Sequence, residues 1–308
     1  AYLTNTKQNK IITVNIPGSK SESNRLLILK KIYPNISIQN LSNCDDTIVL
    51  KRTIDMKNGV VDIHHAGTAM RFLTSFFATK KNIELIITGS KRMQERPIKI
   101  LVDTLIKMGA DISYTKNDGF PPLKIKGKEL VIESLKMEAD VSSQYITSLM
   151  LIAPSLRQGL TINLKNNITS VPYIKMTQAL LYRIGICCSF KNNTIKVNNK
   201  KTINDITVDV ESDWSSASYY YSLVALSDCL EVTLKTFKKD SIQGDSKVIF
   251  LYKRLGVETI FNEKNNSITL RKNRKKVENN NRISEDSYKK FNVKRGLRNS
   301  NGTGVLVG

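Results

Sequence analysis

The length, composition and charge of the chain exclude several classes of protein. It has 308 residues, of which 40% are hydrophobic, and its 48 basic and 27 acidic residues leave a formal net charge of +21. This length suits one large domain or two lobes. The charge favours anionic partners, unless it only reflects a lysine- and asparagine-rich coding bias. No apolar run approaches the ~20 residues of a membrane helix, so we expect no membrane partner.

Cysteine and histidine usage predicts a reducing compartment and no metal site. None of the four cysteines forms a CxxC pair: they are Cys44, Cys187, Cys188 and Cys229. The two histidines, His64 and His65, adjoin each other and are too few for zinc. We therefore expect a cytoplasmic protein. The chain begins with Ala1 rather than Met and shows no signal peptide, so we expect that the true amino terminus lies upstream.

The first predicted elements are a strand, "KIITVNIP" at 10–17, and a helix that follows "GSKSES". Lys20, Ser21 and Arg25 cluster where the strand passes into the helix. Cations and hydroxyls at a helix start favour an anion, because the first backbone N–H groups of the helix carry partial positive charge.

A set of helices then recurs at a nearly constant interval. "GTAMRFLTSFFA" begins at Gly67, "SSQYITSLMLIAP" at Ser142 and "SSASYYYSLVALS" at Ser215, with intervals of 75 and 73 residues. The small and hydroxyl residues at these starts can cap the helix or leave its N–H groups open to an anion. The pattern leaves both interpretations open.

A second set of helices repeats in phase with the first. Each ends at a glycine, Gly109, Gly185 or Gly256, and is followed by two short alternating strands with a polar turn between them. Glycine suits a left-handed helix terminus, and the paired strands predict hairpins. A period of about 70–75 residues indicates repeated βαβαββ units, which we expect to surround a pseudo-threefold axis in an α/β fold.

Six motifs in chain order resemble the enolpyruvyl transferase family. They are "PGSKSESNR" (17–25), "AGTAMR" (66–71), "RMQERP" (92–97), "VSSQYITSLMLIAP" (141–154), "SVPYIKMT" (170–177) and "SDWSSASY" (212–219). The resemblance covers roughly residues 10–260 and is greatest to the branch that uses shikimate 3-phosphate. It implies two lobes that close over the substrates, and a monomer at full length.

The resemblance implies transfer of the enolpyruvyl group from phosphoenolpyruvate to shikimate 3-phosphate with release of phosphate, a step of aromatic amino-acid biosynthesis that leads to chorismate. It implies no metal or organic cofactor. By the same resemblance Lys20 is catalytic and touches both substrates. The shikimate 3-phosphate residues are Lys20, Ser21, Arg25, Ser142, Ser143, Gln144, Ser170 and Tyr173. The phosphoenolpyruvate residues are Lys20, Gly67, Thr68, Arg96 and Gln144.

Physical chemistry supports these roles. The planar fork of an arginine matches a carboxylate or phosphate with two hydrogen bonds, and Lys20 is a compact point charge. Gly67 leaves room for an anion to approach the backbone. Two positions depart from the family pattern: His65 stands where Asn is usual, and Phe72 where Pro is common. Sensitivity to the inhibitor glyphosate is therefore left open.

The resemblance divides the chain into lobes and fails near its end. It predicts a complete lobe at 17–210, a partial second lobe at 1–16 and 211–270, and an atypical polar tail at 271–308. The tail lacks apolar periodicity, and the Asp and Lys-Glu motifs of the family's second lobe find no match. We expect a chain truncated or frameshifted near residue 271, with an incomplete second lobe and impaired activity, since acid–base catalysis contributes ~10²–10⁴-fold.

Two alternatives are weighed against this function. A UDP-N-acetylglucosamine enolpyruvyl transferase would carry a Gly-Ala-Lys-Asn type motif, whereas this chain has Gly-Ser-Lys-Ser at 18–21. A non-catalytic basic protein that binds phosphate-rich ligands or nucleic acid fits the charge and the run "RKNRKK" at 271–276. No RNP, KH, zinc-finger or helix-turn-helix pattern accompanies that run, so nucleic acid is not the expected partner.

Overall fold

Three four-stranded sheets with one shared strand order account for most strands in the part of the chain that the structure describes. The structure is a computed structural model, and it describes residues 10–138, 142–166, 168 and 170–273. Each sheet has one parallel pair of strands and an antiparallel hairpin that extends it, and in the first two sheets a helix joins the parallel pair. A helical crossover is needed because parallel neighbours cannot be joined by a tight turn.

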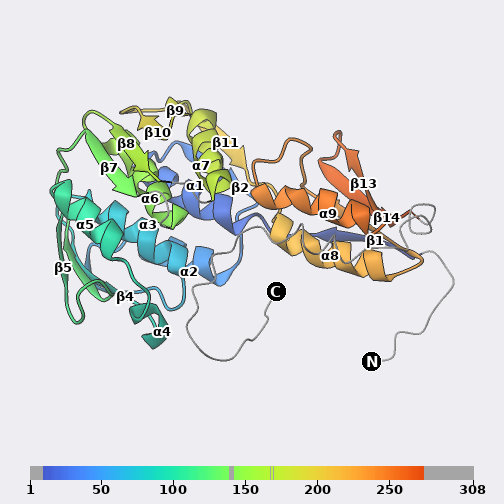
Figure 1. Cartoon of the computed structure of the whole chain (residues 1–308), viewed down its shortest axis with the longest axis horizontal. Helices are drawn as coiled ribbons and strands as arrows, with labels where there is room; N and C mark the ends of the chain where they lie inside the picture. Colours follow the sequence, from blue (N-terminus) through green and yellow to red (C-terminus); the bar gives the residue numbers. More distant parts are fainter. Residues whose placement is uncertain (1–9, 139–141, 167, 169, 274–308) are drawn as a thin grey trace.

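The first two sheets belong to one half of the molecule (Figure 1). The first has the order β3-β4-β6-β5 and the second the order β7-β8-β10-β9. The strands of the first are β3 (Asn58–Asp62), β4 (Glu84–Thr88), β5 (Asp111–Tyr114) and β6 (Leu123–Lys126), with the helices α3 (Gly67–Ala78), α4 (Lys91–Gln94) and α5 (Lys99–Lys107). Those of the second are β7 (Ser134–Glu138), β8 (Leu160–Lys165), β9 (Cys188–Lys191) and β10 (Thr194–Val197), with α6 (Ser143–Ile152), η1 (Ala153–Ser155) and α7 (Val171–Arg183).

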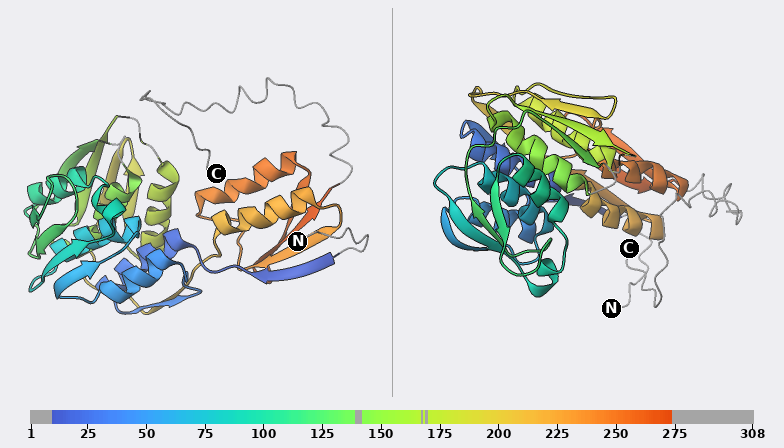
Figure 2. Two further views of the ribbon diagram at one scale, coloured as in Figure 1. Left: turned by 90° about the horizontal axis from the view of Figure 1, so that it is seen from below. Right: turned by 60° about the vertical axis from the view of Figure 1, so that its left-hand side comes forward.

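The third sheet lies in the other half and begins with the first strand of the chain. Its order is β1-β12-β14-β13. Its elements are β1 (Lys10–Asn15), α8 (Trp214–Leu226), β12 (Leu230–Lys235), η2 (Gly244–Lys247), α9 (Val248–Arg254), β13 (Val257–Asn262) and β14 (Ser267–Lys272). The helices α8 and α9 lie on one side of this sheet (Figure 2). The strand β1 pairs with β12 from Lys10 to Asn15, so the first strand of the chain belongs to the same sheet as its last described strands.

A two-stranded parallel sheet completes the first half and was not predicted. Its strands are β2 (Ile36–Gln39) and β11 (Ile206–Asp209), next to α1 (Lys20–Ile32) and α2 (Asp45–Thr53). The strand β11 thus stays with β2, while β1 takes the position beside β12.

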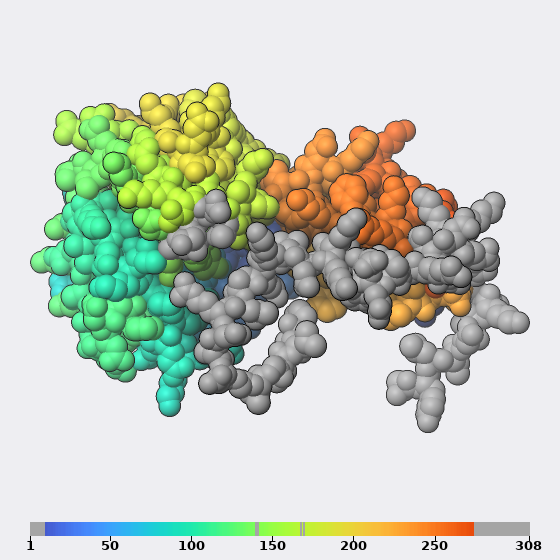
Figure 3. Space-filling view, viewed as in Figure 1, coloured from blue at the N-terminus to red at the C-terminus, as the bar shows by residue number. Residues whose placement is uncertain are grey.

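Two separate hydrophobic cores divide the described chain. One gathers buried side chains between Leu26 and Val210, and the other gathers Ile16 with side chains between Trp214 and Leu270. We call residues 17–210 the larger lobe and residues 10–16 with 211–273 the smaller lobe. The space-filling view places yellow-green residues of the larger lobe directly beside orange residues of the smaller one (Figure 3).

The chain passes between the lobes twice, and the two passages hold each other. Gly18 bridges Ser212, Ser19 N–H donates to the Glu211 carbonyl at 2.8 Å, and Asp213 N–H donates to the Pro17 carbonyl at 3.1 Å. A Cβ at Gly18 would lie 1.8 Å from the Asn40 carbonyl oxygen, so glycine is required at this crossing.

The predicted helix ends and hairpins are confirmed. Gly109, Gly185 and Gly256 have φ of 100°, 81° and 79°, and hairpins follow at β5–β6, β9–β10 and β13–β14. The pseudo-threefold axis and the incompleteness of the second lobe stay predictions. The strand β14 continues to Lys272, beyond the predicted start of the tail at 271. The remainder of that predicted tail, 274–308, lies outside the described residues.

Candidate functional site

The first turns of four helices of the larger lobe meet on one side of it. The side chain of Gln144 in α6 donates to the hydroxyl of Thr68 in α3, and Arg25 in α1 contacts Thr147 in α6 and Thr177 in α7. All of these residues lie in the first two turns of their helices, so the partially positive helix ends converge. Such an arrangement favours an anionic ligand.

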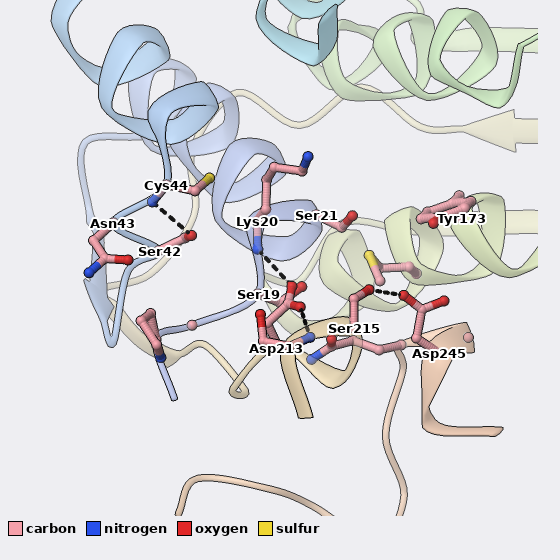
Figure 4. A pocket seen from close by; sticks show the side chains of 16 residues that line it. Ser19, Lys20, Ser21, Ser42, Asn43, Cys44, Tyr173, Asp213, Ser215 and Asp245 are labelled. Atoms are coloured by element: carbon pink, nitrogen blue, oxygen red, sulfur yellow. Dashed lines mark hydrogen bonds between the residues drawn. The ribbon is translucent and has the colours of Figure 1, made fainter. Parts of the chain in front are cut away.

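A cavity of about 380 Å³ lies between this region and the smaller lobe (Figure 4). From the larger lobe it is lined by Lys20, Ser21 and Tyr173, three of the residues predicted for the shikimate 3-phosphate site. The smaller lobe contributes Ser215, Gly244 and two carboxylates, Asp213 and Asp245.

The local sequence explains how Lys20 reaches the cavity. Ser19 caps α1 with its side chain on the backbone N–H of Glu22, so the helix begins at Lys20. The backbone N–H of Lys20 donates to the Asp213 carboxylate at 3.4 Å, which ties the start of α1 to the smaller lobe. The Lys20 side chain is exposed, and its amino group is available to an anion.

Arg25 is a buried cation without an acidic partner. Its side chain is 3% exposed, and no carboxylate of the described residues lies within ion-pair distance. Burial lowers the pKa of Arg25 to about 10, so the guanidinium keeps its charge at neutral pH. Burying an unpaired charge is costly, and this cost is repaid when an anion binds.

The residues predicted for phosphoenolpyruvate form a second group beside α3. A Cβ at Gly67 would lie 2.4 Å from an Nη atom of Arg96, so the absence of a side chain lets this guanidinium lie against the helix start. Gln144 reaches Thr68 from α6 at 3.4 Å. Gly67, Thr68, Arg96 and Gln144 are therefore brought together, although they do not line the 380 Å³ cavity.

The Arg71 side chain of α3 is buried rather than exposed on the protein surface. Its guanidinium donates to the carbonyls of Gly67 and Pro97, and burial lowers its pKa. Its Nε atom has no hydrogen-bond partner among the described residues. Arg71 thus supports the backbone beneath Arg96.

The predicted serines mark helix starts. Ser142 caps α6 by accepting from the backbone N–H of Gln144 at 3.3 Å, and Ser143 is the first residue of that helix. Ser170 precedes α7 in a left-handed conformation with φ of 57°, and its carbonyl accepts from the N–H of Tyr173. None of these three serines lines the cavity.

The start of α8 differs from the prediction. The helix begins at Trp214 rather than Ser215, and Asp213 caps it by accepting from the backbone N–H of Ser216 at 2.8 Å. The Ser215 hydroxyl donates to Asp245. Asp213 and Ser215 both form hydrogen bonds within the smaller lobe. The start of α8 therefore presents carboxylates rather than free N–H groups to the cavity. The Asp of "SDWSS" was the available signal, since Asp is as good an N-cap as Ser.

A buried polar network joins the lobes at the cavity, which Gln243 also lines. Gln243 of the smaller lobe donates to the Glu22 carboxyl at 2.9 Å and to the Ser212 carbonyl at 2.9 Å. The Glu211 carboxylate accepts from Trp214 Nε1 at 2.8 Å and from the Lys238 backbone. Burial, with the negative charge of Glu211, raises the pKa of Glu22 to about 7. This network was not predicted from the sequence.

His65 is placed to hold the loop before α3. Its Nδ1 lies 2.8 Å from the Ser90 hydroxyl, and the His64 carbonyl accepts from the Ser90 N–H. In the described part of the chain no group of three or more His, Cys, Asp and Glu side chains is placed to hold a metal ion. Nor does any described helix combine the length and apolar character needed to cross a membrane.

Comparison with known proteins adds independent evidence. The family model for EPSP synthase (3-phosphoshikimate 1-carboxyvinyltransferase) matches residues 35–285, beyond the predicted end of the resemblance at 260. A 3-phosphoshikimate 1-carboxyvinyltransferase of Bacteroides fragilis (strain YCH46) is 41% identical over 286 residues, 92% of this chain and 68% of the relative. One from Buchnera aphidicola subsp. Cinara cedri is 35% identical, with 85% and 66% covered.

Solved structures show the same fold. An EPSP synthase from Acinetobacter baumannii has a TM-score of 0.68 at 17% identity, over 87% of this chain and 65% of that one. The chain therefore spans about two thirds of the length of these relatives. The family match and the identity to the Bacteroides protein together show that the chain belongs to the EPSP synthase (3-phosphoshikimate 1-carboxyvinyltransferase) family.

Proposed function

We propose that this chain binds shikimate 3-phosphate and phosphoenolpyruvate between its lobes and transfers the enolpyruvyl group with release of phosphate. The observation that carries the proposal is Arg25, a buried cation without an acidic partner among the described residues, beside the cavity that Lys20 lines. Both substrates are multiply charged anions, so binding them requires fixed cations at the site.

The geometry suggests how the work is divided. Arg25, Ser21 and Tyr173 hold shikimate 3-phosphate on the α1–α7 side, with Ser142, Ser143 and Ser170 at neighbouring helix starts. Gly67, Thr68, Arg96 and Gln144 hold phosphoenolpyruvate at the start of α3. Lys20 lies between the lobes and contacts both substrates.

In the reaction a hydroxyl of shikimate 3-phosphate attacks the substituted carbon of phosphoenolpyruvate while its methylene carbon gains a proton. Loss of phosphate, with loss of a proton from the new methyl group, then restores the double bond. Negative charge leaves with the phosphate, and the fixed charges of Lys20 and Arg96 stabilise it. We assign no proton transfer to Asp213 or Asp245, because both carboxylates accept hydrogen bonds from helix-start residues. Impaired turnover of this chain therefore stays our prediction.

The test uses Arg25→Met, which keeps the length of the side chain and removes its charge. Isothermal titration with shikimate 3-phosphate should give at least tenfold weaker binding, since hydrogen bonds to charged groups are worth ~1.5–3 kcal/mol. The free energy of unfolding of the ligand-free variant should not fall, because a buried unpaired charge is removed. Arg52→Met on the surface of α2 is the control and should bind as the wild type does. A folded wild-type chain that does not bind shikimate 3-phosphate would refute the proposal.

Location and partners are further expectations. A cytoplasmic location is supported by the free thiols of Cys44, Cys187 and Cys188. The absence of a nucleic-acid partner and a monomeric full-length state stay predictions. A gel shift at moderate salt tests the first, because nonspecific phosphate contacts weaken steeply as salt rises.

A further inference from the structure

Three hydrogen bonds hold the guanidinium of Arg25 in one orientation. Nε donates to the Thr177 hydroxyl at 2.9 Å, one terminal nitrogen donates to the Ser21 carbonyl at 2.6 Å, and the other donates to the Thr147 hydroxyl at 3.4 Å. A guanidinium has five N–H donors. Among the described residues one N–H on each terminal nitrogen is therefore left without an acceptor, which is the fork that an oxyanion can accept.

The Thr177 hydroxyl has a fixed polarity. Of its two acceptors the Tyr173 carbonyl of the preceding turn lies at 2.8 Å and the Thr147 hydroxyl at 3.4 Å, so its one proton goes to the nearer carbonyl. Its oxygen can then only accept from Arg25, so the shortest Thr–Arg contact is a directed bond between α7 and α1. The Thr147 hydroxyl of α6 accepts a separate, longer bond from Arg25 at 3.4 Å.

Two aromatic rings flank the guanidinium. The Arg25 carbon Cζ lies 5.7 Å from the centre of the Phe72 ring and 5.8 Å from that of Tyr173. At this distance the rings attract the cation and restrict its rotation away from the hydrogen bonds to Thr147 and Thr177. Phe72 is fully buried and does not line the cavity, whereas Tyr173 is partly exposed and lines it.

We propose that Thr177 is a positioning residue that aims the free fork of Arg25 at an oxyanion of the ligand in the interlobe site. This inference rests on the proposed function and adds a residue to it. Thr177 is 0% exposed, so it cannot touch the ligand and must act through Arg25. Without its bond to Thr177 the guanidinium keeps its charge but is no longer held in one orientation. Ligand binding must then also order this side chain, which weakens the affinity.

The first experiment removes the hydroxyl while keeping the volume. Thr177→Val should weaken binding of shikimate 3-phosphate about tenfold in isothermal titration, whereas Thr177→Ser, which keeps the hydroxyl, should bind within about twofold of the wild type. Thr74→Val is the matched control. Thr74 is also fully buried in a helix and donates to the carbonyl four residues earlier, at 2.7 Å, but does not contact Arg25.

A double-mutant cycle separates positioning from a general structural effect. In the Arg25→Lys background the fork is gone, so adding Thr177→Val should change the affinity less than about twofold. An equal tenfold loss in that background, or an equal loss in Thr74→Val, would show that Thr177 does not act through Arg25 and would overturn the inference.

A ligand-free measurement distinguishes this inference from the proposed function. The Arg25 Nε–H should exchange slowly with water in ¹⁵N-resolved NMR of the wild type and of Thr177→Ser, and at least tenfold faster in Thr177→Val. Slow exchange that survives Thr177→Val refutes the positioning role even if shikimate 3-phosphate binds. A protected Nε–H in a wild-type chain that binds no shikimate 3-phosphate refutes the proposed function instead, and with it the ligand-directed role of Thr177.

Discussion

The helices α6 and α8 occupy equivalent places in their sheets but have different surroundings. Every residue of α6 from Tyr145 to Ile152 is buried, because α3 and α7 pack against it within the larger lobe. In α8 only one stripe is buried, made of Trp214, Ala217, Tyr221 and Val224. Two similarly apolar helices thus differ because the larger lobe surrounds one of them and the smaller lobe covers only one face of the other.

The same contrast holds for charge. The cations predicted for the site, Lys20, Arg25 and Arg96, belong to the larger lobe, whereas the smaller lobe supplies the carboxylates Asp213 and Asp245 to the cavity. We infer that the larger lobe provides most of the attraction for anions, and that the smaller lobe closes the cavity. If so, the lobes should respond differently to matched substitutions.

The largest effect is expected from emptying the smaller core. Phe237 is fully buried and its ring packs edge-to-face on Trp214 at 4.8 Å between centroids. Phe237→Ala should cost ~3–5 kcal/mol, because a small core cannot collapse into the space. Trp214 is the only tryptophan of the chain, so its fluorescence reports on the smaller lobe alone. Fluorescence should change at lower denaturant concentration than far-ultraviolet circular dichroism.

The matched substitution in the larger lobe is Phe76→Ala. Phe76 is equally buried and also packs against a ring, that of Phe77, at 5.7 Å. This variant should shift the circular dichroism transition and leave the Trp214 transition nearly unchanged. Coincident transitions in both variants would show that the lobes unfold as one unit and that the comparison fails.

The second effect concerns the buried network between the lobes. Burial raises the pKa of Glu22 from 4.5 to about 7, so its proton-bound form is favoured in the folded state. The stability from this group is present below pH ~4.5 and is lost as pH rises through ~7, a change on the order of 3 kcal/mol. Glu22→Gln should match the wild type at pH 5 and exceed it by about 2–3 kcal/mol at pH 8 in denaturant unfolding.

Glu84→Gln is the control for this pH dependence. Glu84 is exposed, and its ion pair with Lys124 lowers its pKa. A lowered pKa loses its stabilising effect only at acidic pH, so the difference between this variant and the wild type should be the same at pH 5 and pH 8. A Glu22→Gln variant that keeps the wild-type change between pH 5 and pH 8 would contradict the role of Glu22.

A smaller effect is expected where the lobes touch. A Cβ at Gly244 would lie 2.8 Å from Cβ of Pro172, at the start of α7. Gly244→Ala should therefore push the lobes apart at a cost of about 1 kcal/mol and weaken shikimate 3-phosphate binding several-fold. Adding Pro172→Gly removes the Cβ and Cγ atoms that crowd the new methyl group and should recover part of the affinity. Unchanged binding in Gly244→Ala would show that this contact does not set the cavity.

Local patterns predicted much of this structure, because their causes are local. The left-handed glycines, the hairpins and the helix start at Gly67 follow from residues within a few positions, whereas the first helix begins at Lys20, within the stretch that was expected to precede it. Lys20, Ser21 and Tyr173 were placed in the site by motifs, and they line one cavity.

The unpredicted features depend on contacts between distant parts of the chain. Gln243 and Glu22 are 221 positions apart, and Thr177 and Arg25 are 152 apart. No periodicity encodes such a pair, since each partner alone is an ordinary helix or loop residue. The start of α8 was predicted incorrectly for another reason. Asp213 and Ser215 are equally good caps, and because the Ser215 hydroxyl bonds to Asp245, Asp213 caps the helix.

The smallest change in the free energy of unfolding is expected on the exposed face of α8. A substitution there also tests whether this face drives association. Leu226 is 85% exposed and lies on the same side of the helix as Leu223 and Tyr219, which are exposed as well. Contiguous exposed apolar groups favour association, so Leu226→Lys should lower the associated fraction in sedimentation velocity. Its free energy of unfolding should stay within ~0.5 kcal/mol of the wild type, as for most surface substitutions. Val131→Lys changes a residue of the larger lobe that is 78% exposed and should leave association unchanged. Equal effects of the two substitutions would indicate that added charge, rather than this face of α8, governs association.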